Sequence, residues 1–390
     1  MADRRYTFTD TITAGRSVTN LIKMIDPMDV PLVSALGLSN EGKFRFQNWP
    51  GTKIEWLEDT LAPVSSLLTE DMDTTETGMD VTTGQGAYFS PGDILLVNNV
   101  EKVWVSAVTV DTLTVVRGFG ATSGTAATTG DAVVRVGIAR LEGDDSDPSF
   151  TTVPTAPYNY FQIFHREISV TGTEAQVYRY GIQDKYNREL MKFIGGKGAG
   201  GKAKGRAGQL MIDLEKTAYY GERVVRDATT PGGMGGLDTF ITTNLTDLNG
   251  AALDQKTLEN AIEDCWQAGG MPDCILTNSW GKRKITSFYK DSVRTERSEE
   301  MGGVIINKVD TEFGTLSVLM DRWVPATGTG KLYILQKDLC GWVTMPNRGF
   351  FEHKLAISGD YVKGEVLGEY SFVVQNEKAH AIISEFSLTT

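Results

Sequence analysis

The stretch that decides the fold runs from Gly303 to Cys340 and reads GVIINKVDTEFGTLSVLMDRWVPATGTGKLYILQKDLC. It contains an apolar strand, the turn EFGTL, a second strand that ends before RWVP, and a third strand in KLYILQKD. Strands favour the Val, Ile and Tyr found here, and Gly and Pro punctuate them. A Gly-rich turn through SGDYVKGEV (358–366) and the closing run EYSFVVQNEKAHAII (369–383) follow. The chain from Val304 onward is therefore expected to be mostly strands.

An α/β unit is expected just before this region, over residues 251–289. Asp254 is the predicted N-cap of a helix, with Leu253 and Leu258 as its hydrophobic staple. A Gly-Gly pair ends that helix, the strand CILT follows, and a second helix is expected over Lys282–Tyr289. The buried stripe of the first helix is expected to hold Ala261, Ile262, Cys265 and Trp266.

A long helix is expected further upstream, between residues 173 and 221. Thr173 and Gln176 have the spacing of a capping box. The glycine-rich run GGKGAGGKAKGRAG interrupts the helix, because each helical glycine costs about 1 kcal/mol. Helix is expected to resume near Gln209 and to end near Gly221. The buried face of the first part recurs every four residues, at Tyr178, Ile182, Tyr186 and Leu190.

Residues 84–138 predict a separate all-β module, inserted in a longer segment. Four or five short strands with polar connections favour a small barrel or sandwich. The acidic stretch LEGDDSDPSF (141–150) then returns the chain as a flexible linker. The expected strands are Asp93–Val97, Lys102–Val108, Thr112–Arg117 and Ala132–Val136.

The N-terminal residues 1–45 predict an extended arm. They include a polar, Thr-rich stretch, and Pro27 and Pro31 break a short amphipathic piece. Such a segment has little to bury by itself, so neighbouring chains are expected to order it. Residues 46–83 contain the aromatic FQNWPGTKIEW and the acidic, Thr-rich TEDMDTTETGMD, which suit an exposed extended loop.

The composition is that of a globular protein large enough for two or three domains, with 390 residues, of which 41% are hydrophobic and 23% charged. The net charge of 38 − 50 = −12 argues against a protein that grips nucleic acid through its phosphates, which needs excess Lys and Arg. Three scattered cysteines form no disulfide framework. The chain shows no signal-peptide apolar region and no apolar run of the roughly 20 residues that cross a bilayer, so no membrane partner is expected.

The glycine-rich run matches two nucleotide-binding patterns. Gly196, Gly201 and Lys202 fit G-x-x-x-x-G-K, and Gly198 completes G-x-G-x-x-G. Both patterns need a strand before the loop, whereas helix is expected here, and Ala203 replaces the hydroxyl that would bind magnesium. A nucleotide-binding enzyme is therefore the weaker hypothesis, and no cofactor is expected. The alternative is a mobile basic loop, which stays solvated or meets an acidic patch or DNA phosphate, formed by Lys197, Lys202, Lys204 and Arg206.

No metal or catalytic site is expected. The three histidines are far apart in the sequence and lack metal-ligand spacing: His165, His353 and His380. Cys265 and Cys274 are better explained as core residues than as nucleophiles. The carboxylates between residues 142 and 147 lack the glycine and distal Glu of a calcium loop, so a hydrated linker fits better. Tryptophans beside Pro or Gly are candidate interface anchors, although core packing explains them equally well: Trp49, Trp56 and Trp323.

The order and spacing of these parts resemble one family, the major capsid proteins of tailed bacteriophages with the Hong Kong ninety-seven fold. The resemblance rests on FQIFHREISVTGTEA before the long helix, DLEKTAYYG at its end, GMGGLDTFITTN leading to the α/β unit, and NEKAHAII near the end of the chain. It covers residues 155–390 well and the preceding residues loosely. It implies an α+β fold.

The resemblance also implies a role for each segment. Two features depart from the family, because the β-module exceeds a plain hairpin and the glycine run breaks the spine helix. The lysine and asparagine that cross-link some members have no identifiable counterpart. The implied parts are an N-terminal arm at 1–45, an extension loop at 46–170 carrying the module at 84–138, a peripheral domain with the spine helix at 171–250, an axial domain at 251–350, and terminal strands at 351–390 that complete the peripheral and axial domains.

The implied function is that of a non-enzymatic structural protein. It would self-assemble into pentamers and hexamers of an icosahedral shell around packaged double-stranded DNA. Its partners would be copies of itself, a portal, a scaffolding or decoration protein, and DNA touched non-specifically on the inner face. It would assemble in the cytoplasm of the bacterial host and end in the virion. A tail or decoration protein built from β-modules is the alternative, which the helical middle of the chain disfavours.

Overall fold

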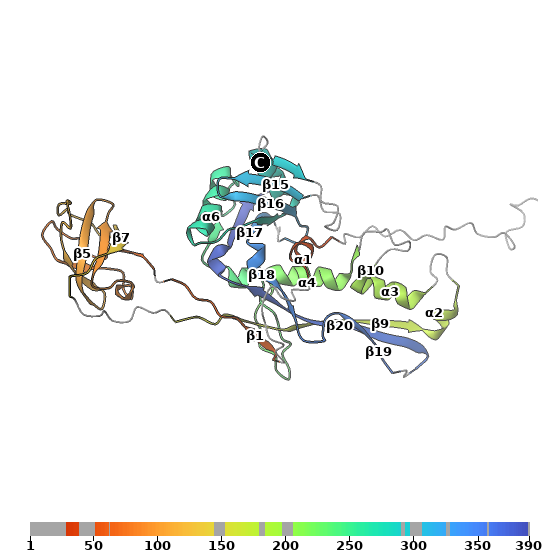
Figure 1. Cartoon of the computed structure of the whole chain (residues 1–390). Helices are drawn as coiled ribbons and strands as arrows, with labels where there is room; N and C mark the ends of the chain where they lie inside the picture. Colours follow the sequence, from red (N-terminus) through yellow and green to blue (C-terminus); the bar gives the residue numbers. More distant parts are fainter. Residues whose placement is uncertain are drawn as a thin grey trace, which may run out of the picture. The chain divides into compact units, whose positions relative to one another are not determined.

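The computed structural model divides the chain into two units, one made of Met1–Trp56 with Pro157–Thr390 and the other of Leu57–Ala156 (Figure 1). We call these the larger unit and the inserted unit, because the second interrupts the first along the chain. The residues described are 29–38, 51–61, 63–143, 153–178, 184–196, 206–289, 293–296, 306–324, 328–356 and 359–388.

A mixed sheet forms the centre of the larger unit. β12 runs parallel to β21, and β13 runs parallel to β16, while the other neighbours are antiparallel. The hairpin between β15 and β16 reverses at Glu312 and Phe313, which confirms the turn expected in EFGTL. Within the described residues its seven strands lie in the order β12 (Leu245–Asp247), β21 (Ala381–Ser387), β17 (Thr329–Leu335), β13 (Cys274–Thr277), β16 (Gly314–Met320), β15 (Ile306–Thr311) and β14 (Val293–Glu296).

Both faces of this sheet are buried at its centre. Ile275 of β13 packs on the side of helices α6 (Gln255–Gln267) and α7 (Ser279–Phe288), while Cys274 and Leu276 point into the opposite core. A strand covered on both faces needs apolar residues at every position rather than at alternate ones. This explains the continuous apolar run CILT in the sequence.

A second sheet of the larger unit is built on the long strand β20 (Tyr361–Val374). β9 (Gln162–Thr171) pairs with its first ten residues, while β19 (Phe351–Lys354) and β18 (Cys340–Thr344) pair with successive parts of it. All these pairs are antiparallel. Helices α3 (Lys185–Ile194) and α4 (Gln209–Tyr220) contact β9.

The Gly-rich turn expected through residues 358–366 is wrong from Tyr361 onward, because β20 begins there. Gly364 lies inside the strand, and a Cβ atom at this position would come within 1.9 Å of the Tyr186 hydroxyl. The glycine therefore permits the close approach of α3 to the sheet rather than a turn.

The helical segment before the glycine run is two helices rather than one. α2 (Gly172–Gln176) is capped by Thr171 and not by Thr173, and Val177 after it is extended. A new helix, α3, starts after Asp184, whose side chain accepts a hydrogen bond from the Asn187 amide at 3.0 Å. The predicted buried face is therefore wrong at Tyr178, which is 76% exposed, and Ile182 lies outside the described residues. Tyr186 and Leu190 are partly buried against the core, as predicted. α4 begins and ends as predicted.

Helix α6 follows the prediction at its start but not at its last turn. Asp254 accepts a hydrogen bond from the Thr257 amide at 2.8 Å, which confirms the cap. Trp266 is 53% exposed, so its assignment to the buried stripe is wrong. Each residue turns a helix by about 100°, which carries Trp266 past the edge of the stripe that ends at Cys265. Helix α7 begins at Ser279 rather than Lys282, because Asn278 caps it.

The remaining elements of the larger unit are short. Helix α1 (Pro31–Leu36) buries Leu32, Val33 and Leu36 in the core of its own chain, so the expectation that neighbouring chains order residues 1–45 is wrong for this part of the arm. β1 pairs with β8, and β10 pairs with β11, both antiparallel. None of the helices that the structure describes is long and apolar enough to span a bilayer. These elements are α1 (Pro31–Leu36), β1 (Lys53–Glu55), β8 (Tyr158–Tyr160), β10 (Gly195–Gly196), β11 (Arg206–Ala207), α5 (Leu237–Phe240), and the 3₁₀ turns η2 (Lys337–Leu339) and η3 (Glu377–Ala379).

The inserted unit holds a small closed β-barrel around its own apolar core. Leu68 and Val81 form a bridge between its two edge strands. Thr69 donates to the Asp80 carbonyl, and Thr82 donates to that of Leu67, each at 3.0 Å. Closure decides in favour of the barrel over the sandwich. The antiparallel order is β2 (Ser65–Leu67), β7 (Ala132–Ile138), β4 (Asp93–Val97), β5 (Glu101–Thr109), β6 (Thr112–Val116) and β3 (Gly78–Asp80), with η1 (Gly86–Tyr88) before β4.

The four strands predicted in this unit are present, and β4 has the predicted bounds. The barrel nevertheless extends beyond the predicted range 84–138, because β2 and β3 precede it. These two strands have three residues each and lie among Thr, Ser and acidic residues, so they carry little strand signal.

Candidate assembly surfaces

The described residues contain no group of three or more His, Cys, Asp or Glu arranged to hold a metal ion. Cys265 and Cys274 are core residues, as predicted, and burial raises the pKa of each thiol to about 12. A thiol with so high a pKa supplies very little thiolate at neutral pH, and the thiolate is the nucleophile.

Two histidines that are distant in sequence share one carboxylate. His165 on β9 lies 3.1 Å from Glu365 on β20, and His353 on β19 lies 3.3 Å from its other oxygen. The contacts with His353 and His165 hold the pKa of Glu365 below its usual value. The sequence offered no signal for this cluster, because His165 and Glu365 are 200 residues apart.

The predicted basic loop lies largely outside the described residues, which exclude Lys197, Lys202 and Lys204. Arg206 is described by its backbone alone, in β11, where it pairs with Gly196 of β10. The helix α3 precedes the run, as predicted, and a nucleotide-binding glycine loop would instead follow a strand.

The three candidate tryptophans differ in their surroundings. Trp49 lies outside the described residues. Trp56 is 4% exposed and packs on Phe240, with ring centroids 5.6 Å apart, which is the core packing that the sequence left open. Trp323 is half-buried; its indole N–H donates to the Asp29 carbonyl at 2.8 Å, and the Lys216 ammonium lies 4.4 Å from its ring centroid.

Large apolar side chains are exposed on the two chain segments that lead into and out of the barrel. Leu57 is 78% exposed and Leu61 95%, while Leu141 is 65% and Val153 85% exposed. Glu58 and Thr155 form an antiparallel bridge between the two segments. We call Leu57, Leu61, Leu141 and Val153 the linker patch.

A second exposed apolar group lies on the larger unit. Trp266 packs on Phe313, with ring centroids 5.9 Å apart, and Met271 just after α6 is 71% exposed. We call Trp266 and Met271, with Phe313, the helix α6 patch. Sequence reasoning missed this surface because it assigned Trp266 to the core.

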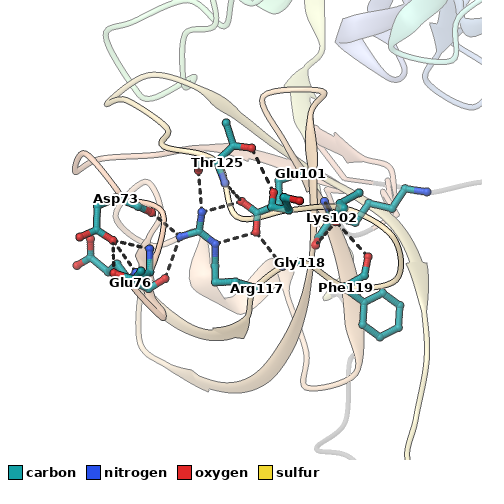
Figure 2. A network of polar contacts seen from close by, with 11 residues as sticks. Asp73, Glu76, Glu101, Lys102, Arg117, Gly118, Phe119 and Thr125 are labelled. Carbon is teal, nitrogen blue, oxygen red and sulfur yellow. Dashed lines mark hydrogen bonds and ion pairs between the residues drawn. The ribbon is translucent and has the colours of Figure 1, made fainter.

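A polar network holds the loops of the barrel in place (Figure 2). Arg117, just after β6, reaches carbonyl groups of Asp73 and Glu76 in the β2–β3 loop and that of Thr125. Glu101, at the start of β5, accepts hydrogen bonds from Arg117 and from the amides of Gly118 and Thr125. The barrel therefore presents fixed loops, although they are rich in Thr and Gly.

The family model of the SU10 major capsid protein matches residues 4–387, which is nearly the whole chain. The chain belongs to this family of phage major capsid proteins. It is therefore a structural protein of a phage capsid, and this decides against the alternative of a tail or decoration protein. A search of curated protein sequences found no match.

A solved capsid structure has the same fold as this capsid protein. The capsid of Myoviridae phage XM1 matches with a TM-score of 0.50 and 9% identity, over 95% of this chain and 96% of the other. The fold is thus the α+β Hong Kong ninety-seven capsid fold, as the resemblance implied. Mycobacterium phage Adephagia matches at 10% identity with a TM-score of 0.46, over the full length of both chains.

Proposed function

We propose that this capsid protein forms pentamers and hexamers that close into an icosahedral shell around packaged double-stranded DNA. The observation that carries the proposal is the linker patch. Leu57, Leu61 and Val153 are each more than three-quarters exposed in the single chain. When another chain covers exposed apolar side chains on an extended segment, the association is stabilised by about 25 cal/mol for each Å² of apolar surface buried.

Each segment of the chain has its own role in the proposed shell. Membership of the family over residues 4–387 supports these roles as a group. Copies of the same chain are the main partners. The roles are an arm at 1–45 that reaches across the shell, an extension loop at 46–170 that lies over a neighbouring subunit, a peripheral domain at 171–250, an axial domain at 251–350 at the capsomer centres, and terminal strands at 351–390.

A shell that packages DNA has other partners besides copies of its own subunit. A portal and a scaffolding or decoration protein meet it during assembly in the cytoplasm of the bacterial host. DNA lies against the inner face without sequence-specific contacts. The net charge of −12 supports this, since an acidic wall does not bind phosphates tightly. The product is the capsid of the virion.

Electron microscopy of the expressed chain, alone and with a scaffolding protein, tests the proposal. We expect closed shells or capsomers of five and six copies. Leu57→Ser with Leu61→Ser should leave the circular dichroism of the subunit unchanged and reduce shell yield. Val100→Ser is the matched control, because Val100 is 57% exposed in a turn of the barrel and outside the patch. A wild-type chain that stays a monodisperse monomer under all assembly conditions contradicts the proposal.

A further inference from the structure

A pair of buried carboxyl groups lies beneath the first described helix. Glu215 on α4 and Asp321 just after β16 are both fully buried. Among the described residues, neither forms an ion pair with a lysine or arginine. The Glu215 carboxyl group lies within hydrogen-bonding reach of Asp321. Two buried carboxylates so placed, with no cation partner, cannot both be ionised at acceptable cost.

The hydrogen bonds indicate where a proton resides. Asp321 accepts two strong hydrogen bonds, from the Tyr219 hydroxyl at 2.6 Å and from the Trp323 amide at 2.8 Å. Glu215 Oε1 accepts a hydrogen bond from the Leu32 amide at 3.0 Å, and the Val33 amide also interacts with this carboxyl group, while the buried Oε2 receives no hydrogen bond. A proton on Oε2 would satisfy that atom and donate to Asp321. Burial and the hydrogen bond to Asp321 raise the pKa of Glu215 well above its usual value.

The segment that closes this site is the short helix α1. Leu32, Val33 and Leu36 are buried, and the helix contacts α4 and β18 (Figure 1). The Leu32 amide lies directly on Glu215 although the two are 183 residues apart in sequence. Undocking of α1 would therefore expose the acid pair to water.

We propose that the docking of residues 29–36 on α4 requires one proton shared by Glu215 and Asp321, so that alkaline pH releases this segment. At high pH the pair carries two negative charges. Opening the site hydrates them, whereas the docked segment keeps them in a low dielectric. The inference concerns contacts within one chain and does not depend on how shells assemble.

The other charged groups around the pair already have partners. Arg322 pairs with Asp29 at 3.0 Å, ahead of α1. Lys331 on β17 pairs with Asp238 on α5 at 2.7 Å, and Asp238 also accepts the Tyr333 hydroxyl. The sequence of α1 itself, PLVSAL, contains no charged residue. Lys216 lies against the Trp323 ring, and burial raises the pKa of Tyr219 well above its usual value, so Tyr219 stays neutral.

The sign of the pH effect follows from proton uptake on docking. The docked state binds one more proton than the undocked state between the usual glutamate pKa, about 4.3, and the raised one. Docking is therefore strongest in acid and weakens as pH rises, by up to about tenfold for each pH unit in that window.

Amide hydrogen exchange of the full-length chain between pH 6 and 9 tests this, with each rate divided by the intrinsic rate at that pH. The probes are the amides of Leu32, Ser34 and Gly37, which donate to Glu215, Val30 and Val33. We expect their protection to fall as pH rises. Glu215→Gln keeps an acceptor for the Leu32 amide and gains a donor for Asp321. The protection of the probe amides in this variant should therefore not change with pH.

Asp213→Asn is the matched control, because Asp213 is on the same helix but pairs with Arg166 on β9. In Asp213→Asn the protection of the probe amides should depend on pH as it does in the wild type. Protection that is independent of pH in the wild type, or an unchanged slope in Glu215→Gln, overturns the proposal. If Glu215→Gln does not fold, the pH dependence of amide protection in the wild type still tests the proposal. The wild type should also show the infrared band of a protonated carboxyl group at neutral pH. The absence of this band overturns the proposal.

Discussion

The guanidinium group of Arg117 forms a two-pronged pair with Glu101, with Nε 2.8 Å from Oε1 and Nη2 2.6 Å from Oε2. The Arg117 side chain is 10% exposed and that of Glu101 is 2% exposed. The three other N–H groups of Arg117 donate to the carbonyls of Asp73, Glu76 and Thr125, so all five of its donors are used. One side chain thus joins the barrel wall to two of its loops.

Replacement of Arg117 by Ala should destabilise the barrel by about 3–5 kcal/mol, because it leaves a buried carboxylate without its partner. Arg117→Lys should recover only part of this, since an ammonium group offers three donors and no fork. Chemical denaturation of the inserted unit, residues 57–156, would measure the free energy of unfolding of both variants. The control Lys102→Ala, at an exposed site on β5, should change the free energy of unfolding by less than about 0.5 kcal/mol.

The same pair predicts how the barrel responds to acid. Burial alone would raise the pKa of Glu101, but the hydrogen bonds from Arg117, Thr125 and Gly118 outweigh it, and the pKa is lowered. The stabilisation is therefore present above the usual glutamate pKa and is lost as pH falls through the lowered one. Glu101→Gln should be less stable at pH 7, and its stability should depend less on pH between 5 and 2. Equal pH slopes for both proteins would contradict the assignment.

Removal of the barrel should preserve the larger unit. Replacing residues 60–153 by a short Gly-Ser linker joins segments whose backbones already pair, because Glu58 and Thr155 bond to each other at 2.9 and 2.8 Å. We expect a folded subunit. The replacement also removes Leu61, Leu141 and Val153 of the linker patch, so shells should form in lower yield, and those that form should come apart at a lower temperature in differential scanning calorimetry.

The narrower replacement of residues 84–138 serves as the comparison. It removes the partners of β2 and β3 and exposes core residues such as Leu68 and Met79. This deletion should aggregate. An insoluble product of the wider deletion would show that the larger unit needs the barrel to fold, and shells of unchanged heat stability would show that the barrel does not strengthen them.

The helix α6 patch predicts a contact between subunits. Trp266→Ser should change the stability of the subunit by about 1 kcal/mol or less, since it loses mainly the ring contact with Phe313. Light scattering should nevertheless record slower or less complete assembly. Asp264→Ser, at an exposed position on the same helix, is the control and should assemble normally. Normal assembly of Trp266→Ser would exclude the patch from the contacts that drive closure.

The basic loop predicts a salt-dependent contact rather than a nucleotide site. Neutralisation of Lys197, Lys202, Lys204 and Arg206 together should leave the unfolding temperature unchanged and alter assembly or its dependence on salt. Calorimetry with ATP or GTP should detect no binding, since Ala203 offers no magnesium ligand. Micromolar affinity that Lys202→Ala abolishes would reverse this conclusion.

Elements with local signals could be predicted from the sequence. The run of Ile, Leu and Val between turn residues predicted β4 with its observed bounds, and the apolar face after the glycine run predicted α4. The Asp254 cap was predicted because a capping side chain bonds an amide only three residues away. The order of such elements along the chain was also enough to indicate the capsid family.

Features that depend on partners far along the chain emerged only from the folded structure. Gly364 lies within a strand because it pairs with β9 and β19, and it is glycine because the Tyr186 hydroxyl occupies the space of a side chain. β2 and β3 are strands because they pair with β7 and β6, and the Leu68–Val81 bridge next to them closes the barrel. Glu215 meets Leu32 across 183 residues. Local propensity contains no information on such contacts, because they form only when burial of separate apolar faces brings distant side chains together.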